Sequence, residues 1–161
     1  MASVDYFLKI EGIPGESQDY KHKNEIELIA WSWGESQLGA EGYGGGGGAG
    51  KVSMQDLAIT KKVDKASPVL FRSCADGSHI KSAVLTARKA GKEQQEYLKI
   101  TLTDLLVSSF STAGHSGDVV PNENVTLNFS KIEWEYKEQK PDGTLGAPIK
   151  AWFNLKEHKG G

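Results

Sequence analysis

Apolar and polar residues alternate along several stretches of this chain, which is the pattern of β-strands that bury one face. In residues 4–10 the apolar side chains of Val4, Tyr6, Leu8 and Ile10 share one face, and charged side chains lie on the other. Further strands are predicted at residues 25–37, 52–60, 79–91, 124–139 and 148–157. Residues 96–111 are predicted to form one long strand or two short ones. This series of strands predicts a mainly β fold.

The segment at residues 25–33 differs from the others because both of its faces are apolar near the middle. One face carries Ile29, Trp31 and Trp33, and the other carries Leu28, Ala30 and Ser32. We therefore expect protein against each side of this strand. The two tryptophans are interpreted as a pair that packs in the core, with Ser32 on a polar wall.

The last two predicted strands carry specific expectations about burial. In residues 124–139 one face holds Val125, Leu127 and Phe129, whereas Ile132, Trp134 and Tyr136 have the opposite parity. A bulge or a change of packing partner is therefore expected near Ser130 and Lys131. In the final strand the residues expected to face inward are Ile149, Ala151, Phe153 and Leu155.

One short helix is indicated after the third predicted strand. Ser67 is a typical N-cap, Pro68 suits the first helical position, and Gly77 is placed to end the helix. Its narrow apolar face would consist of Val69, Leu70 and Cys74. Many strands, one helix and no alternation of strands with helices predict a β-barrel or sandwich.

The bulk composition indicates one soluble globular domain spanning residues 1–161. A formal charge of -2 and a pI near 6.1 do not indicate a basic surface that would bind DNA or RNA. Cys74 is the only cysteine, so an internal disulfide is excluded and folding in the cytoplasm is expected. The N-terminal residues lack the pattern of a signal peptide, and no apolar run approaches the roughly 20 residues of a membrane span.

The most unusual stretch is the glycine-rich run at residues 34–50. Its length is about the upper limit for an unstructured loop inside a compact domain. Gly45 to Lys51 fits the start of the phosphate-binding pattern GxxxxGK[ST], but Val52 stands where a hydroxyl is required to bind magnesium. The residues after Lys51 alternate and do not predict the helix that such a loop requires. Nucleotide binding is therefore disfavoured. If a partner orders this run, its binding energy would have to compensate for the conformational entropy that the run loses.

No constellation of catalytic or metal-ligating residues emerges from the sequence. The four histidines, which are far apart and interpreted as surface residues, are His22, His79, His115 and His158. Gly114-His115-Ser116-Gly117 resembles a nucleophile elbow, but Asp118 replaces its final glycine. Cys74 is interpreted as a small buried thiol. We therefore predict a protein with no enzymatic activity, cofactor or metal.

Five stretches, in this order and over nearly the whole length, carry a family resemblance: VDYFLKIEGIPGES, EIELIAWSWGESQ, GGGGGAGKVSMQDL, KAGKEQQEYLKITLTDLLVSSFS and ENVTLNFSKIEWEY. Together they resemble the haemolysin-coregulated protein family, Hcp, the tube subunits of bacterial type VI secretion systems. The resemblance implies a β-barrel of two antiparallel sheets with one short flanking α-helix. It also implies homohexameric rings, joined head to tail, that stack into a tube; a contractile sheath expels the tube with its spike protein and its effectors.

The resemblance further implies roles for particular residues. Ser32 would face the pore and contact effectors, while Trp31 and Trp33 would pack in the wall behind it. The loop that contacts the neighbouring ring would include Gln37, Gly42, Tyr43, Gly44, Gly45, Gly46, Gly47, Gly48 and Gly50. The same likeness implies assembly in the bacterial cytoplasm and secretion without a signal peptide. It also implies no contact with nucleic acid or membrane. The short tail at residues 157–161 indicates a conduit without a fused toxin domain.

Two alternatives of other classes remain open at this point. The first is a monomeric ligand-binding or hydrolytic β-barrel that uses the glycine-rich run as a lid over a pocket. The second is a phosphate-binding enzyme, which Val52 already disfavours.

Overall fold

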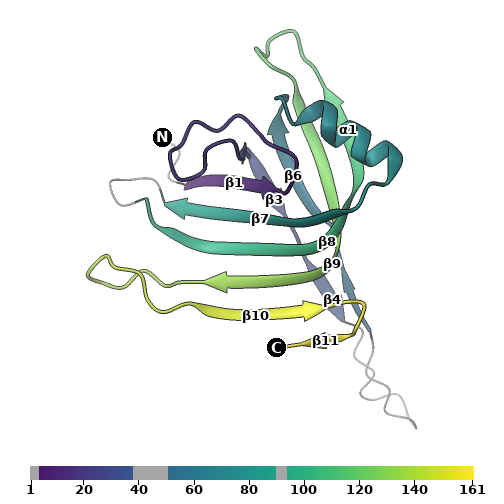
Figure 1. The fold of residues 1–161 in the computed structure, drawn as a ribbon. Coiled ribbons are helices and arrows are strands. Elements are labelled where there is room, and N and C mark those ends of the chain that lie inside the picture. The colour runs from purple at the N-terminus through teal and green to yellow at the C-terminus, as the bar shows by residue number, and fades with distance from the viewer. Residues whose placement is uncertain (1–3, 38–50, 90–93) are drawn as a thin grey trace.

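The protein is built mainly from antiparallel β-strands, and its computed structural model describes residues 4–37, 51–89 and 94–161 (Figure 1). The strands are β1 (Val4–Ile10), β2 (Ile26–Glu27), β3 (Ala30–Ser32), β4 (Glu35–Gln37), β5 (Val52–Met54), β6 (Leu57–Lys62), β7 (Ile80–Lys89), β8 (Glu96–Ala113), β9 (Asn122–Tyr136), β10 (Ile149–Asn154) and β11 (Lys159–Gly160). Nine of them form one sheet, in which the order β11-β10-β9-β8-β7-β1-β2 is extended by β6, which pairs with both β9 and β3. The strands β4 and β5 form a separate ribbon.

The large sheet curls into a barrel-like shape because one segment, residues 26–32, bonds to two distant strands. The Leu28 N–H donates to the carbonyl oxygen of Tyr6 on β1 at 3.0 Å, and the Ile29 N–H donates to that of Thr60 on β6 at 2.8 Å. The same segment thus completes a ring through β1, β7, β8, β9 and β6. The mainly β fold with two antiparallel sheets and one helix is confirmed.

This change of partner also breaks the single strand predicted at residues 25–37 into β2, β3 and β4. Trp31 packs inward, but Ile29 is 49% exposed and does not share its burial. Ala30 and Ser32 are exposed on the outer side. The expectation of protein against both sides is therefore not met within the described part of one chain, since none of its residues covers the outer side of β3.

The long strands β8 and β9 bend sharply near their middles. On β9 the buried positions change parity between Phe129 and Ile132, and β8 makes the same change around Asp104, whose φ is +51°. Figure 1 shows the two strands running beside β7 and β10 and then turning to run beside β6. The register is continuous through Thr103 and Lys131, so no bulge lies there.

The parity change of β9 instead reflects a change of partner, one of the two alternatives predicted. Residues 122–127 of β9 pair with β6, whereas residues 131–136 pair with β10. The register shift between β8 and β9 lies elsewhere, between Val107 and Ser109.

The core fills the space enclosed by this curled sheet, and the helix α1 (Ser67–Asp76) covers the upper half of β8. Phe71 of α1 meets Phe110 of β8 with ring centroids 6.3 Å apart. Fully buried members of the core include Leu8, Ile26, Leu57, Leu70, Leu85, Ile100, Val125 and Leu127. Among the residues described, no helix is long and apolar enough to cross a membrane.

The predicted helix is confirmed, with a correction at its start. Pro68 lies in the first turn, and Gly77 ends the helix in the left-handed conformation at φ +66°, where glycine is favoured. The N-cap is Ala66 and not Ser67, because the Ser67 hydroxyl is used inside the protein beside Lys61. Of the predicted apolar face, Leu70 is fully buried, and Val69 and Cys74 are partly buried.

The expected inward face of the last strand is wrong at two positions. Ile149 is 70% exposed and Ala151 is also exposed, while Phe153 and Leu155 are half-buried. β10 and β11 extend the sheet beyond the ring of strands that encloses the core. For that reason no described layer covers the start of β10.

Candidate functional site

Ser32 lies in a row of small side chains that crosses four strands. It pairs with Ala58 of β6, Ala58 pairs with Thr126 of β9, and Thr126 pairs with Ser109 of β8. The hydroxyl oxygens of Ser109 and Thr126 lie 2.5 Å apart. Strand pairing places the four side chains on the same outward side of the sheet.

A second row runs parallel to the first, two residues along each strand. Ala30 of β3 pairs with Thr60 of β6, Thr60 with Asn124 of β9, and Asn124 with Ser111 of β8. The Thr60 hydroxyl donates to Asn124 Oδ1 at 2.9 Å. The two rows together, Ser32, Ala58, Thr126, Ser109, Ala30, Thr60, Asn124 and Ser111, are called the polar face below.

The polar face is a wall and not a pocket. None of its eight side chains is charged or aromatic, and Ser32, Ala30 and Asn124 are exposed. At one end the Asp56 carboxylate accepts hydrogen bonds from Asn128 Nδ2 at 2.9 Å and from Ser108 Oγ at 2.5 Å. Such a surface offers hydroxyl and amide hydrogen bonds over a broad area, without a nucleophile paired to a base.

The two tryptophans that flank Ser32 lie on the other side of the backbone, against the core. Trp31 meets Tyr6 at 6.2 Å and Trp134 at 6.4 Å between ring centroids. Trp33 meets Trp134 at 6.0 Å. The chain therefore carries bulky aromatic packing directly behind a face of small polar groups.

The glycine-rich run is described only at its two ends. Gln37 is exposed at the end of β4 and pairs with Val52 of β5. The other residues predicted for the stacking loop, which lie outside the described residues, are Gly42, Tyr43, Gly44, Gly45, Gly46, Gly47, Gly48 and Gly50. Lys51 is followed by strand β5, so the helix that a phosphate-binding loop needs does not follow it.

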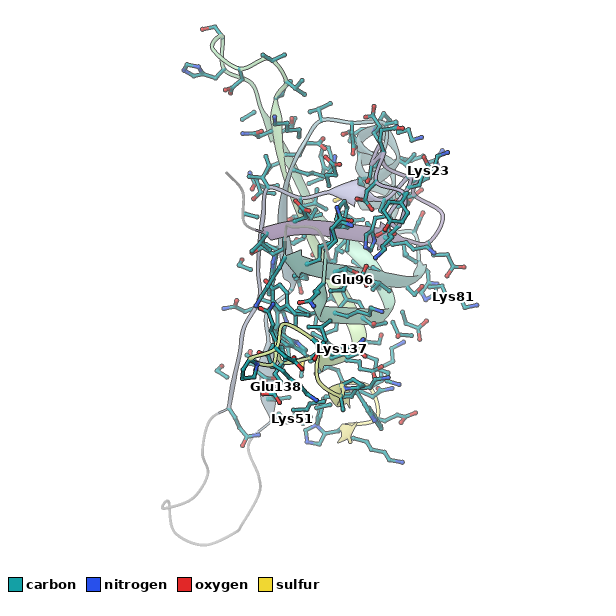
Figure 2. The ribbon with its side chains drawn as sticks, turned by 90° about the vertical axis from the view of Figure 1, so that its left-hand side faces the viewer. Lys23, Lys51, Lys81, Glu96, Lys137 and Glu138 are labelled. Carbon is teal, nitrogen blue, oxygen red and sulfur yellow. The ribbon has the colours of Figure 1, made fainter. Side chains whose placement is uncertain are left out.

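His22 contradicts the prediction that all four histidines are surface residues. It is 6% exposed, stacks on Phe7 with ring centroids 4.4 Å apart, and brings Nδ1 to 3.0 Å from the Glu25 carboxylate. Its Nε2 lies 2.6 Å from Oε1 of Glu96, the first residue of β8, which Figure 2 labels. The contact between His22 and Glu96 holds the loop between β1 and β2 against the sheet, because it joins residues that are far apart in sequence.

The remaining histidines, His79, His115 and His158, are exposed as predicted. Within the described ranges no three side chains of the metal-ligating types come together. The loop that carries His115 and Ser116 joins two strands of the sheet, so no strand-to-helix turn of the kind found in hydrolases exists there.

Comparison with known proteins decides the family. The family model described as "Type VI secretion system effector, Hcp" matches residues 7–136 of this chain. The chain belongs to the Hcp family. Protein hcp1 of Pseudomonas aeruginosa is 51% identical over 158 residues, which cover 97% of this chain and 98% of that protein.

Solved structures of Hcp proteins have the same fold. Hcp1 from Salmonella typhimurium is 43% identical, covers 99% of both chains and superposes with a TM-score of 0.83. A structure described as that of a type six secretion system protein is 28% identical, with a TM-score of 0.91 over 99% of this chain and all of the other. The family resemblance seen in the sequence is therefore confirmed over nearly the full Hcp chain.

Proposed function

We propose that this Hcp chain is a tube subunit of a type VI secretion system, and that its homohexameric ring is lined by the polar face. The observation that carries this proposal is the exposed stretch of small uncharged side chains across β3, β6, β9 and β8. A ring of copies joined head to tail needs two different complementary surfaces on each subunit. It would turn one further surface, the same in every copy, toward the lumen.

In this proposal the protein works without chemistry of its own. Ser32 lies near the middle of the lumen wall, where effectors are held through hydrogen bonds, and Trp31 and Trp33 support the wall from behind. Rings stack through the loop from Gln37 to Gly50, and the tube pairs with a spike protein and a contractile sheath. Assembly takes place in the bacterial cytoplasm, and the assembled tube is then secreted.

The mass of the native protein in solution is the primary test. Light scattering behind a sizing column should report a particle of six times the 17.5 kDa chain mass. A protein that stays monomeric at high concentration would refute the ring and favour the lidded β-barrel as the alternative.

Substituting Ser32→Gln should leave the ring mass unchanged and reduce effector retention. The longer side chain would project from a row of small residues, and a misfit of this kind costs about 1–3 kcal/mol, or roughly five- to 150-fold in affinity. Retention is measured by co-purification of an effector with the ring. Ser116→Gln, on the exposed loop between β8 and β9 that contributes no residue to the polar face, is the matched control. Equal retention by the two variants would remove Ser32 from the effector-binding wall.

A further inference from the structure

A depression lies between the turn that follows β1 and the tip of the loop between β1 and β2, residues 11–25. Its volume is about 530 Å³. It shares no lining residue with the polar face, whose strands are β3, β6, β8 and β9. A volume in this range is typical of a site for a small ligand or for several side chains of a partner.

The loop that forms this depression is held in one shape because two stretches of it pair with each other. The Gly15 N–H donates to the carbonyl oxygen of Asn24 at 2.7 Å, and the Asn24 N–H donates to that of Ser17 at 2.9 Å. Asn24 has a φ of +63°, which few residues other than glycine adopt. The buried side chains of His22 and Arg88 hold the same loop against the sheet. A depression preformed in this way loses little conformational entropy when a partner binds.

Lysine side chains dominate the rim of the depression. His22 points inward, whereas the residues on either side of it are exposed; the exposed lysines of the rim are Lys9, Lys21 and Lys23. None of these three ammonium groups forms an ion pair with a described residue. Figure 2 shows Lys23 on the same side of the molecule as the exposed Lys81 of β7. Positive charge therefore gathers here, although the whole chain carries a formal charge of -2.

The two carboxylates that line the depression are engaged elsewhere. The Glu25 side chain is 14% exposed, and both of its oxygens lie 3.0 Å from Nδ1 of His22. Glu11 accepts a hydrogen bond from the Ser82 hydroxyl at 3.2 Å. The lysine ammonium groups are thus left to contact carboxylates from outside the chain.

We propose that the depression binds an acidic segment of a partner protein, with carboxylates on the three lysines and an apolar side chain on Tyr20. The Tyr20 ring is 77% exposed and offers an apolar surface with a polar tip. Lys21 Nζ lies 5.6 Å from the centre of this ring, so the charged and aromatic contacts are adjacent. Nucleic acid is disfavoured by the overall negative charge of the chain, and a free phosphate would not use the aromatic ring. The inference goes beyond the proposed tube and does not require the ring.

Fluorescence anisotropy with the labelled peptide GEEFEEG tests the charged contacts. Wild-type protein should bind this peptide saturably at low ionic strength. The double variant Lys21→Gln with Lys23→Gln should bind it about tenfold more weakly, because two ion pairs are lost. Lys150→Gln with Lys156→Gln makes the same change in net charge at exposed lysines outside the depression and should bind as the wild type does. An equal loss in both double variants would show that only the overall charge matters, and would overturn the site.

The aromatic contact is tested by changing Tyr20 and the peptide together. Tyr20→Phe should retain binding, whereas Tyr20→Ser should weaken it about fivefold. The peptide GEESEEG should show a similar loss with wild-type protein and no further loss with Tyr20→Ser, because the two changes remove one contact. Losses that simply add would remove Tyr20 from the site.

Two further outcomes would overturn the proposal. The first is an absence of saturable peptide binding by wild-type protein. The second is displacement of the peptide by inorganic phosphate or oligothymidylate at equal concentration, which would reassign the depression to a simple anion or to nucleic acid. Light scattering of the same samples reports the ring mass independently, so a failure of this site is distinguished from a failure of the tube.

Discussion

Replacing Lys61 by methionine will lower the free energy of unfolding by about 3–5 kcal/mol, because it leaves a buried carboxylate without its partner. The Lys61 ammonium lies 2.5 Å from Glu123 Oε1 and 2.8 Å from Asp64 Oδ1, and it donates to Ser67 Oγ at 3.2 Å. The side chains of Lys61 and Glu123 are 0% and 1% exposed. This network joins β6, β9 and the start of α1 in the interior.

Urea unfolding of the purified variants measures this effect. Lys62→Met is the matched control, because Lys62 is the next residue of β6 and is exposed; its effect should stay within about 0.5 kcal/mol. The double variant Lys61→Met with Glu123→Met should recover much of the lost stability, since it removes both buried charges. A Lys61→Met protein as stable as the Lys62→Met control would show that Glu123 does not depend on this ion pair.

Replacing Arg88 by methionine should lower the free energy of unfolding by about 2–3 kcal/mol. This loss is smaller than the loss expected for a fully buried ion pair, because the Asp5 carboxylate is partly exposed. The Arg88 guanidinium is 3% exposed and donates to Asp19 Oδ2 at 2.5 Å and to Asp5 Oδ2 at 3.3 Å. Its Cζ also lies 4.7 Å from the centre of the Phe7 ring, on which His22 stacks. Arg88 therefore holds the loop that carries Asp19 against β1 and β7.

The ion pair between Arg88 and Asp19 also makes the stability of the protein depend on pH. The hydrogen bond from Arg88 lowers the pKa of Asp19 from 3.8 to about 2. Because this pKa is lower in the folded state than in the unfolded state, the stabilisation is complete above pH 3.8 and is lost as the pH falls toward 2. Wild-type protein should therefore lose stability across that window, and Arg88→Met should lose less.

Unfolding measured at about pH 5 and about pH 2.5 separates the two proteins. Lys89→Met, at the exposed neighbouring position, should behave as the wild type does. An identical loss of stability in Arg88→Met and wild type between these values would mean that the Asp19 pair does not contribute to folding.

Features that depend on neighbours in sequence were predicted with success. The helix followed from Pro68 and Gly77, whose effects on the backbone act within one turn. The parity change in β9 was visible in Phe129 and Ile132, because side-chain direction alternates along any strand. The family resemblance was visible as well, since it rests on the order of several short stretches.

Features that depend on residues far apart in sequence escaped prediction. His22 is buried because Phe7 stacks on it and Glu96, 74 residues away, bonds to its ring. Ile149 was expected inside because its strand alternates, yet β10 lies beyond the ring of strands that encloses the core. A local pattern shows which residues share a face, but it does not show whether another layer covers that face.

The sequence by itself determined the mainly β architecture, the helix and the family, because strand period, helix-ending residues and motif order are local properties of the chain. Only the tertiary structure decided which small residues accompany Ser32, since strand register brings Thr126 and Ser109 to it from about a hundred and about eighty residues away. It likewise decided that Trp33 and Trp134 line one groove, with indole N–H groups that meet no acceptor among the described residues. Both arrangements arise from the curling of one sheet until distant strands meet, which no single stretch of sequence encodes.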